Sequence, residues 1–210
     1  MKQIIEDLQW RYSAKKYNPT KKLKPEDIAI IRQSLRLTPT SYGLQALKFL
    51  FIETAELREA LKKHAWNQTQ VTDASHLLVI CSRINIDEAY IDQHMQNVAT
   101  IRNMDIAQLQ GYGNHVKTKL GEKGTQKTNE WSARQAYIAL GQLLHTCAQL
   151  RIDATPMEGF EADEVNELLD LEKDNWQAVL LVPMGYRSDE DPVQHMAKVR
   201  RKEEELFENR

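Results

Sequence analysis

The chain has 210 residues, of which 41% are hydrophobic and 28% are charged. This composition is that of a globular domain, and it excludes a disordered tail, a collagen-like repeat and a coiled-coil rod. The 28 Lys and Arg residues nearly balance the 30 Asp and Glu residues, for a formal net charge of −2, which argues against a protein whose main task is to coat nucleic acid. We expect one domain over residues 1–210.

Neither membrane insertion nor export is expected. No apolar run approaches the roughly 18 residues that a spanning helix needs, and the opening residues, MKQIIEDLQW, lack the apolar stretch of a secretory signal. Cys81 and Cys147 lie among apolar residues without metal-ligand spacing, so we expect two buried free thiols. These features predict a cytoplasmic protein with no metal site and with neither a membrane nor nucleic acid as partner.

In the first half of the chain, apolar spacing predicts helices over 2–10, 25–37 and 55–64. The second of these begins at a proline that suits the first turn of a helix, and it ends near Thr38, because the proline that follows disfavours helical backbone there. Two continuous apolar runs, 49–52 and 76–81, predict buried strands.

In the second half, we expect a polar helix over about 86–110, then a glycine-rich segment, 111–124, that is either a mobile loop or a short helix bounded by loops. A helix over 128–151 is apolar over so wide an arc that it should be central and buried. A helix over 162–171 and a third buried strand over 179–182 precede a charged tail, expected on the surface or over a partner chain. Buried strands interleaved with helices predict an α/β or α+β sandwich whose sheet is covered on both faces.

The usual signatures of nucleotide-binding and hydrolytic enzymes are absent from the sequence. It contains no GxxxxGK[ST], no GxGxxG after a strand, no HExxH and no GxSxG. Its six histidines show no metal-ligand spacing and are expected to be surface or structural residues.

Basic residues gather instead near both ends of the chain. Arg11, Ser13 and Lys15 alternate, and in an extended backbone such residues face the same side. They could converge on one anion that Lys198 and Arg200 approach from the other end, because arginine binds phosphate through a planar fork and lysine as a point charge. The alternative is a solvated basic stretch without a ligand.

Two further segments combine small, hydroxylated and flexible residues. Residues 39–45, PTSYGLQ, lie between a predicted helix and a predicted strand, and residues 156–160, PMEGF, follow the long central helix. Each could be an ordinary turn, with Gly159 supplying a positive φ in the second.

These segments, in this order, resemble the FMN-dependent nitroreductase family, in its oxygen-insensitive NAD(P)H nitroreductase and flavin reductase branch. The resemblance extends over essentially the whole chain, through RYSAKKYNPTKKL, LTPTSYGLQALKF, DASHLLVICSR, EWSARQAYIALGQLL, ATPMEGF, VPMGYRSDEDP and KVRR. It implies an α+β fold, a three-layer α-β-α sandwich with a mixed sheet, in an intertwined homodimer. It also implies FMN in clefts at the dimer interface, each contacted by both chains.

The resemblance further implies which residues contact FMN. They are Arg11, Tyr12, Ser13, Lys15, Pro39, Thr40, Ser41, Gly43, Asn67, Gln70, Pro156, Met157, Glu158, Gly159, Lys198 and Arg200. Residues 11–13 resemble phosphate and ring contacts, residues 198–200 resemble a C-terminal phosphate clamp, and Lys15 resembles a cation beside the pyrimidine edge of the flavin. Residues 39–43 would come from the partner chain and touch the ribityl and dimethylbenzene parts.

The remaining contacts concern the flavin ring itself. Asn67 resembles the residue that hydrogen-bonds the pyrimidine, and Gln70 stands where many relatives carry a second lysine. Residues 156–159 resemble the segment over one ring face, with backbone N–H groups near N5 and O4. No catalytic residue is assigned, because a flavin that exchanges hydride needs no dedicated acid–base side chain.

The implied activity is an enzyme that takes a hydride from NADH or NADPH. It would pass two electrons, by a ping-pong mechanism, to a nitroaromatic, a quinone or a similar flat small-molecule acceptor. Alternatives are other flavin chemistry on the same fold, such as dihydropteridine reduction or dehalogenation, a flavin-binding protein without turnover, and a dimeric structural protein whose basic ends are only surface charge.

Overall fold

The computed structural model describes residues 2–210 and has a four-stranded sheet at its centre. The strands are β1 (Leu47–Ile52), β2 (His76–Arg83), β3 (Asp153–Ala154) and β4 (Trp176–Gly185). Their order is β1-β2-β4-β3, and every neighbouring pair is antiparallel. Among the described residues the sheet is therefore antiparallel, and the expectation of a mixed sheet is wrong, because none of these strands runs parallel to the one it pairs with.

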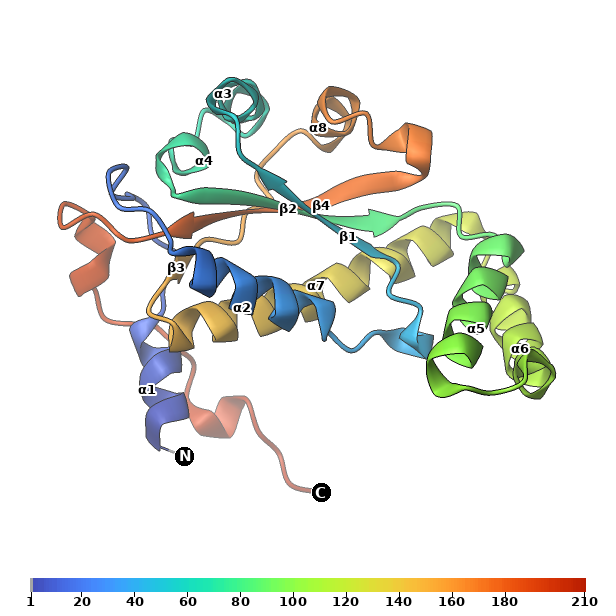
Figure 1. Ribbon diagram of the computed structural model, residues 1–210. Helices are drawn as coiled ribbons and strands as arrows, with labels where there is room; N and C mark the ends of the chain where they lie inside the picture. Colours follow the sequence, from blue (N-terminus) through green and yellow to red (C-terminus); the bar gives the residue numbers. More distant parts are fainter. Residues whose placement is uncertain (1) are drawn as a thin grey trace.

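Helices cover both faces of this sheet, so the molecule has three layers (Figure 1). One helical layer is formed by α3 (Ala55–His64), α4 (Gln70–Asp73) and α8 (Ala162–Leu168). The other is formed by α2 (Pro25–Arg36) and α7 (Thr125–Gln149), with α1 (Lys2–Trp10) near the C-terminal end of α7. The expected α+β fold with α-β-α layering is confirmed.

The side chains of β2 divide between two apolar clusters. Leu78 and Ile80 join the cluster formed with α2 and α7, whereas Leu77 and Val79 join the cluster formed with α3, α4 and α8. Successive side chains of a strand point to opposite faces, so a sheet covered on both sides needs an uninterrupted apolar run. The three predicted strands are present for this reason. Each is longer than expected, and the third extends over 176–185 instead of 179–182.

Helix α7 runs through the middle of its layer, as its sequence predicts. Ala136, Ala139 and Leu143 are fully buried against the sheet and α2. Tyr137 and Ile138, on another side of the helix, are 44% and 45% exposed. This long helix does not combine the length and hydropathy that a bilayer span requires, and neither does any other helix within residues 2–210.

Residues 88–121 form an α5–α6 arm that extends from one end of the sandwich (Figure 1). Helix α5 (Glu88–Arg102) stops at Asn103, whose φ of 53° is left-handed, so the helix expected over 86–110 ends early. Helix α6 (Gln110–Gly121) then occupies most of the glycine-rich segment. That segment is thus a short helix and not a mobile loop. Gly113 permits close packing, because a Cβ there would lie 3.2 Å from Met95 Cγ.

Both cysteines are free and buried, as expected. Burial raises the pKa of the Cys81 thiol and of the Cys147 thiol to about 12. Neither sulfur is therefore a reactive thiolate near neutral pH. Over residues 2–210, no group of three or more His, Cys, Asp and Glu side chains is arranged to hold a metal ion.

Candidate functional site

The two ends of the chain meet beside the last turn of α1. The Nζ atom of Lys198 donates a hydrogen bond to the carbonyl of Leu8 at 2.9 Å and another to the carbonyl of Arg11. These carbonyls are available because the last residues of a helix have no intrahelical partner for their C=O groups. The tail is thereby fixed on the N-terminal helix, and the basic residues predicted at opposite ends of the sequence lie together.

Positive charge accumulates at this point. Partial burial lowers the pKa of Lys198, and the neighbouring charges of Arg11, Arg200 and Arg187 lower it further. The pKa of Arg11 is lowered by burial and then by Arg200. Among the ion pairs formed by the described residues, none involves Arg11, Lys198 or Arg200. We call Arg11, Lys198 and Arg200 the basic cluster, and its excess charge makes it suitable for an anion.

Asp191 holds the segment that follows Arg11. Its carboxylate, 1% exposed as a residue, accepts a hydrogen bond from the Tyr12 hydroxyl at 3.0 Å and from the amides of Lys15 at 2.6 Å and Lys16 at 3.1 Å. It also accepts the amide of Val193 at 2.9 Å. Burial alone would raise the pKa of Asp191, but these hydrogen bonds outweigh burial and the net pKa lies below its usual value. Sequence reasoning missed this residue, because an aspartate in a charged tail carries no pattern of its own.

A second loop pair joins residues 64–70 to residues 156–161. Gln68 Nε2 donates to the carbonyl of Gly159 at 2.9 Å, and Trp66 Nε1 donates to Glu161 Oε1 at 2.8 Å. The indole covers Gly159 so closely that a Cβ there would lie 2.7 Å from the ring. Trp66 and Asn67 both have left-handed φ values, 51° and 55°. The residues on either side of Asn67 therefore contact residues 159 and 161. Gly159 itself, contrary to the expectation, does not have a positive φ.

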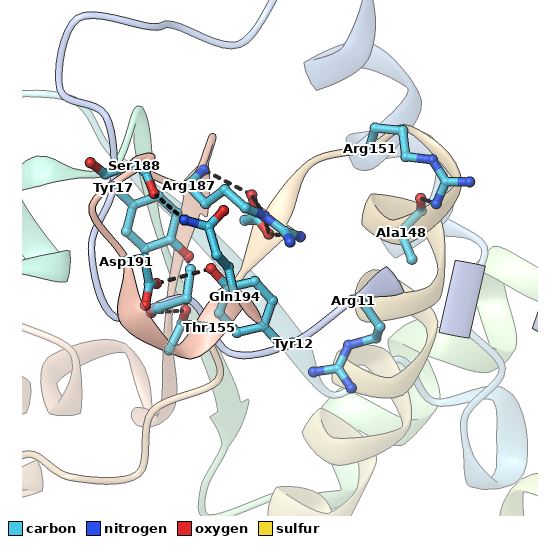
Figure 2. A network of polar contacts seen from close by, with 12 residues as sticks. Arg11, Tyr12, Tyr17, Ala148, Arg151, Thr155, Arg187, Ser188, Asp191 and Gln194 are labelled. Carbon is cyan, nitrogen blue, oxygen red and sulfur yellow. Dashed lines mark hydrogen bonds and ion pairs between the residues drawn. The ribbon is translucent and has the colours of Figure 1, made fainter. Parts of the chain in front are cut away.

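Thr155 connects this loop pair to the N-terminal segment. Its hydroxyl donates to the carbonyl of Ala14 at 2.9 Å and lies 2.8 Å from the hydroxyl of Tyr17. The Tyr17 hydroxyl also donates to the carbonyl of Pro183 at 3.0 Å. Figure 2 shows Tyr17 and Thr155 beside Tyr12 and Asp191. Three of the predicted segments, 11–15, 67–70 and 156–159, are therefore held at one side of the molecule.

Glu158 reaches from this side to α7. Its carboxylate accepts a hydrogen bond from the Tyr137 hydroxyl at 2.5 Å. Burial and this contact with Glu158 raise the pKa of Tyr137 to about 12, so the phenol stays protonated across the neutral range. This pair fixes the 156–159 loop against the exposed side of α7.

The predicted segment 39–43 lies elsewhere. The amide of Ser41 donates to Gln135 Oε1 at 2.9 Å, and positions two apart on a helix, such as 135 and 137, point to opposite sides. The loop of Ser41 and the loop of Glu158 are therefore on opposite sides of α7. Figure 1 shows the stretch between α2 and β1 turning near the α5–α6 arm, away from α1. One chain alone does not bring residues 39–43 to the other predicted residues.

The remaining predicted residues differ in their exposure to solvent. Lys15 is exposed at the bend that Asp191 holds. Gln70 and Met157 are buried, with only 8% and 4% of their surface exposed, and Met157 belongs to the apolar cluster of the α3 layer. Their side chains are thus parts of the core in this chain, whereas Asn67 and Glu158 are exposed.

Comparison with known proteins agrees with this architecture. The family model described as "Nitroreductase family" matches residues 8–186. A protein of Staphylococcus haemolyticus, provisionally named an NAD(P)H nitroreductase, is 31% identical over 213 residues, with 98% of this chain and 96% of that protein covered.

Solved structures share the fold. A Bacillus subtilis protein, provisionally named a nitroreductase, superposes with a TM-score of 0.87 at 19% identity, with both chains covered completely. A provisionally named nitroreductase of Exiguobacterium sibiricum, solved in complex with FMN, superposes with a TM-score of 0.82 at 20% identity, with 99% of this chain and 97% of that chain covered. With a family match over most of its length and a three-layer fold shared with these structures, the chain belongs to the nitroreductase family.

Proposed function

We propose that this protein is an FMN-dependent NAD(P)H oxidoreductase that passes two electrons to a flat small-molecule acceptor, such as a nitroaromatic or a quinone. The observation that carries the proposal is the basic cluster, whose three cations take part in no ion pair among the described residues. Hydrogen bonds of Thr155 and Gln68 connect the segment after Arg11 to the 155–161 loop and that loop to the loop of Asn67. The named relatives and the FMN complex of a structural neighbour support the same reading.

The residues present fit the phosphate of FMN. Arg11 offers a planar fork of donors, and Lys198 is already fixed by two carbonyls of the α1 end. The charge that lowers the pKa of Lys198 would be relieved by a phosphate, which gains charge-assisted hydrogen bonds in return. When bound, FMN would supply the two-electron chemistry that no side chain of this protein offers.

The protein itself would position the flavin and shield it from water. Gln68 and Trp66 hold the backbone around Gly159, whose N–H would then be available to the flavin edge. The Tyr137–Glu158 pair holds the neighbouring position from α7. Because binding, orientation and exclusion of water suffice, a ping-pong exchange of nicotinamide and acceptor at one open face needs no further acid or base.

We infer in addition that two copies complete the site. The 39–43 segment lies across α7 from the rest of the site. The edge of β1 has no strand beside it among the described residues, and Val199 and Phe207 of the tail are 86% and 71% exposed. A homodimer would cover such apolar groups and bring residues 39–43 to the ribityl and dimethylbenzene parts of the FMN held by the partner.

The visible spectrum of the purified protein, taken after FMN is added and the protein is desalted, tests the proposal first. A two-banded flavin spectrum that survives desalting, with a dimer mass in light scattering, is the expected result. Oxidation of NADH or NADPH is then followed with menadione or a nitrofuran as acceptor. A flavin-loaded protein that oxidises neither nucleotide would instead be a flavin-binding protein without turnover, and a protein that retains no FMN would overturn the enzyme assignment.

A further inference from the structure

Arg187 lies between two aromatic rings beside the basic cluster. Its guanidinium carbon is 4.3 Å from the centroid of the Trp10 ring and 4.4 Å from the centroid of the Tyr12 ring. A planar guanidinium over the face of an aromatic ring is attracted by the ring's negative face. One side chain thus holds both neighbours of Arg11.

Asp153 fixes the direction of that guanidinium. Arg187 Nη2 donates to Asp153 Oδ1 at 2.6 Å, Nε donates to both carboxylate oxygens at 3.0 Å, and the Arg187 amide donates to Oδ2 at 2.8 Å. The Asp153 side chain is 2% exposed and the Arg187 side chain is 19% exposed. Asp153 begins β3, so the pair ties Trp10 and Tyr12 to the edge of the sheet. Figure 2 shows Arg187 beside Tyr12, with Arg11 set apart from this network.

The same tryptophan has a second, independent guanidinium. Arg151 lies 5.1 Å from the Trp10 ring centroid, and its own carboxylate partner is Asp7, at 2.8 Å. Arg151 therefore resembles Arg187, because each arginine stacks on the Trp10 ring and forms an ion pair with a buried aspartate. It differs in one respect, because its ring contact is with Trp10 alone and it does not connect the two residues that flank Arg11.

We propose that Arg187 is a positioning residue for the anion site: by stacking between Trp10 and Tyr12, it fixes the backbone at Arg11 so that Arg11 and Lys198 meet one phosphate. This inference rests on the proposed function, since it takes FMN as the ligand. The argument is geometric. Arg11 has one held residue on each side, and its carbonyl is a hydrogen-bond acceptor for Lys198. A shift of the backbone at Arg11 would therefore move two cations of the basic cluster together.

A role through charge alone is separable from this positioning role. Arg187 also adds positive charge near Lys198, which a lysine at position 187 would keep. Lysine would not keep the planar fork that holds Asp153 while it stacks on two rings. Arg187→Lys thus removes the positioning and preserves the charge, and Arg151→Lys is its matched control on the same tryptophan.

The test measures the dissociation constants of FMN and of riboflavin, which lacks the phosphate, by quenching of flavin fluorescence. We expect Arg187→Lys to weaken FMN binding by about tenfold, as the loss of two ring contacts and of preorganisation suggests, and to change riboflavin binding by less than about twofold. Arg151→Lys should change neither by more than about twofold. Circular dichroism melts establish that each variant is folded.

A double-mutant cycle with Trp10→Leu tests whether Arg187 acts through its contact with Trp10. Trp10→Leu alone should weaken FMN selectively, and adding Arg187→Lys to it should cost less than Arg187→Lys costs alone, because residues that act through one contact are not additive. Trp10→Leu also keeps the inference testable if Arg187→Lys does not fold, since it leaves the Asp153 pair intact.

The possible failures differ from one another. Equal loss of FMN and riboflavin, full additivity with Trp10→Leu, or equal effects of Arg187→Lys and Arg151→Lys would each overturn the positioning role. Unchanged FMN binding in Arg187→Lys, with normal binding in the wild type, would overturn it while leaving the proposed function intact. A wild-type protein that holds no FMN would overturn the proposed function and this assignment together.

Discussion

The side of the molecule that carries the basic cluster and the α5–α6 arm are stabilised in different ways. On the first side, polar groups that are distant in sequence hold the loops, as Asp191 holds Tyr12 across 179 residues and Thr155 holds Ala14 across 141. The arm has a small apolar cluster that includes Ile91, Met95 and Val116, and it leaves Ile101 75% exposed. Buried polar networks admit one arrangement, whereas apolar surfaces tolerate repacking. We therefore expect cofactor binding to depend on the first side and variation to be tolerated in the arm.

The largest effect on flavin binding should come from the basic cluster itself. Arg11→Ala combined with Arg200→Ala removes two cations, each able to make charge-assisted hydrogen bonds, and should weaken FMN binding by at least about 100-fold, or roughly 3 kcal/mol. Ultrafiltration of the FMN-loaded protein measures the loss. Lys63→Ala combined with Lys173→Ala removes the same charge from exposed sites and should retain FMN. Native affinity in the first variant would contradict the phosphate assignment.

Next should come Asp191→Asn, which weakens the hydrogen bonds to Tyr12, Lys15 and Lys16. Removing the charge from this buried acceptor should lower the free energy of unfolding by about 2–3 kcal/mol and weaken FMN binding about tenfold through the released segment. Urea denaturation and flavin quenching measure the two effects. Asp189→Asn, an exposed change of the same kind, should alter the free energy of unfolding by less than about 0.5 kcal/mol.

The effect of Asp191 should also depend on pH in a defined direction. Because its pKa is lower in the folded than in the unfolded protein, the stability it adds is present above the ordinary carboxyl pKa and is lost as the pH falls through the lowered one. The stability difference between wild type and Asp191→Asn should therefore shrink in acid. Urea titrations from neutral pH downward measure it, and a difference that stays constant would contradict the assigned ionisation.

A smaller effect is expected from Gly159→Ala. A Cβ at this position would lie 2.7 Å from the Trp66 ring, so the indole must move and the backbone near the flavin edge loses a support. We expect kcat to fall by about three- to tenfold, with FMN retained. Gly141→Ala is the control, because a Cβ there meets nothing within 4 Å, and it should leave kcat unchanged. Equal kcat values in the two variants would show that the contact between Trp66 and Gly159 does not support the flavin site.

The smallest effect on flavin binding should come from the arm. Met95→Ala empties a site that is 3% exposed and should cost about 2–4 kcal/mol of local stability, yet change the FMN dissociation constant by less than about twofold. Hydrogen exchange followed by mass spectrometry should show lost protection confined to residues 88–121 and to Tyr42, Leu44 and Trp131, which pack in the same apolar cluster. Loss of protection around Arg11 and Asp191 as well would mean that the two regions are coupled, and the contrast between them would fail.

Local signals account for the parts of the fold that the sequence predicts. Continuous apolar runs identify the strands, and Pro25 with the acidic first turn of α2 identifies a helix start. In the α5–α6 arm, the composition predicts the wrong helix boundary and suggests a loop in place of a helix. Asn103 ends α5 through a left-handed conformation that apolar spacing does not reveal, and the glycines of α6 suggest a loop although one of them packs on Met95.

The candidate site likewise contains residues that the sequence predicts and residues that depend on distant partners. Residue type and spacing leave both an anion site and a solvated basic stretch open for Arg11, Lys198 and Arg200, and the family resemblance favours the anion site. In the structure the three residues lie close enough to act on one another's charge. Asp153, Arg187 and Asp191 are missed because their function depends on partners distant in the sequence, which only the folded chain supplies. The antiparallel sheet is missed because apolar runs report burial and not strand direction.

The tail that carries Lys198 and Arg200 contributes no side chain to the apolar clusters of the described chain, which extend only as far as Tyr186. The apolar clusters and two of the three clustered cations are therefore encoded in separate stretches of sequence. Limited proteolysis after Met196, or a bulky C-terminal fusion that lifts the tail from α1, should leave a folded chain without Lys198 and Arg200 at the end of α1. For practical work, an affinity tag at this end would be a poor choice, since a colourless preparation could then result from the tag.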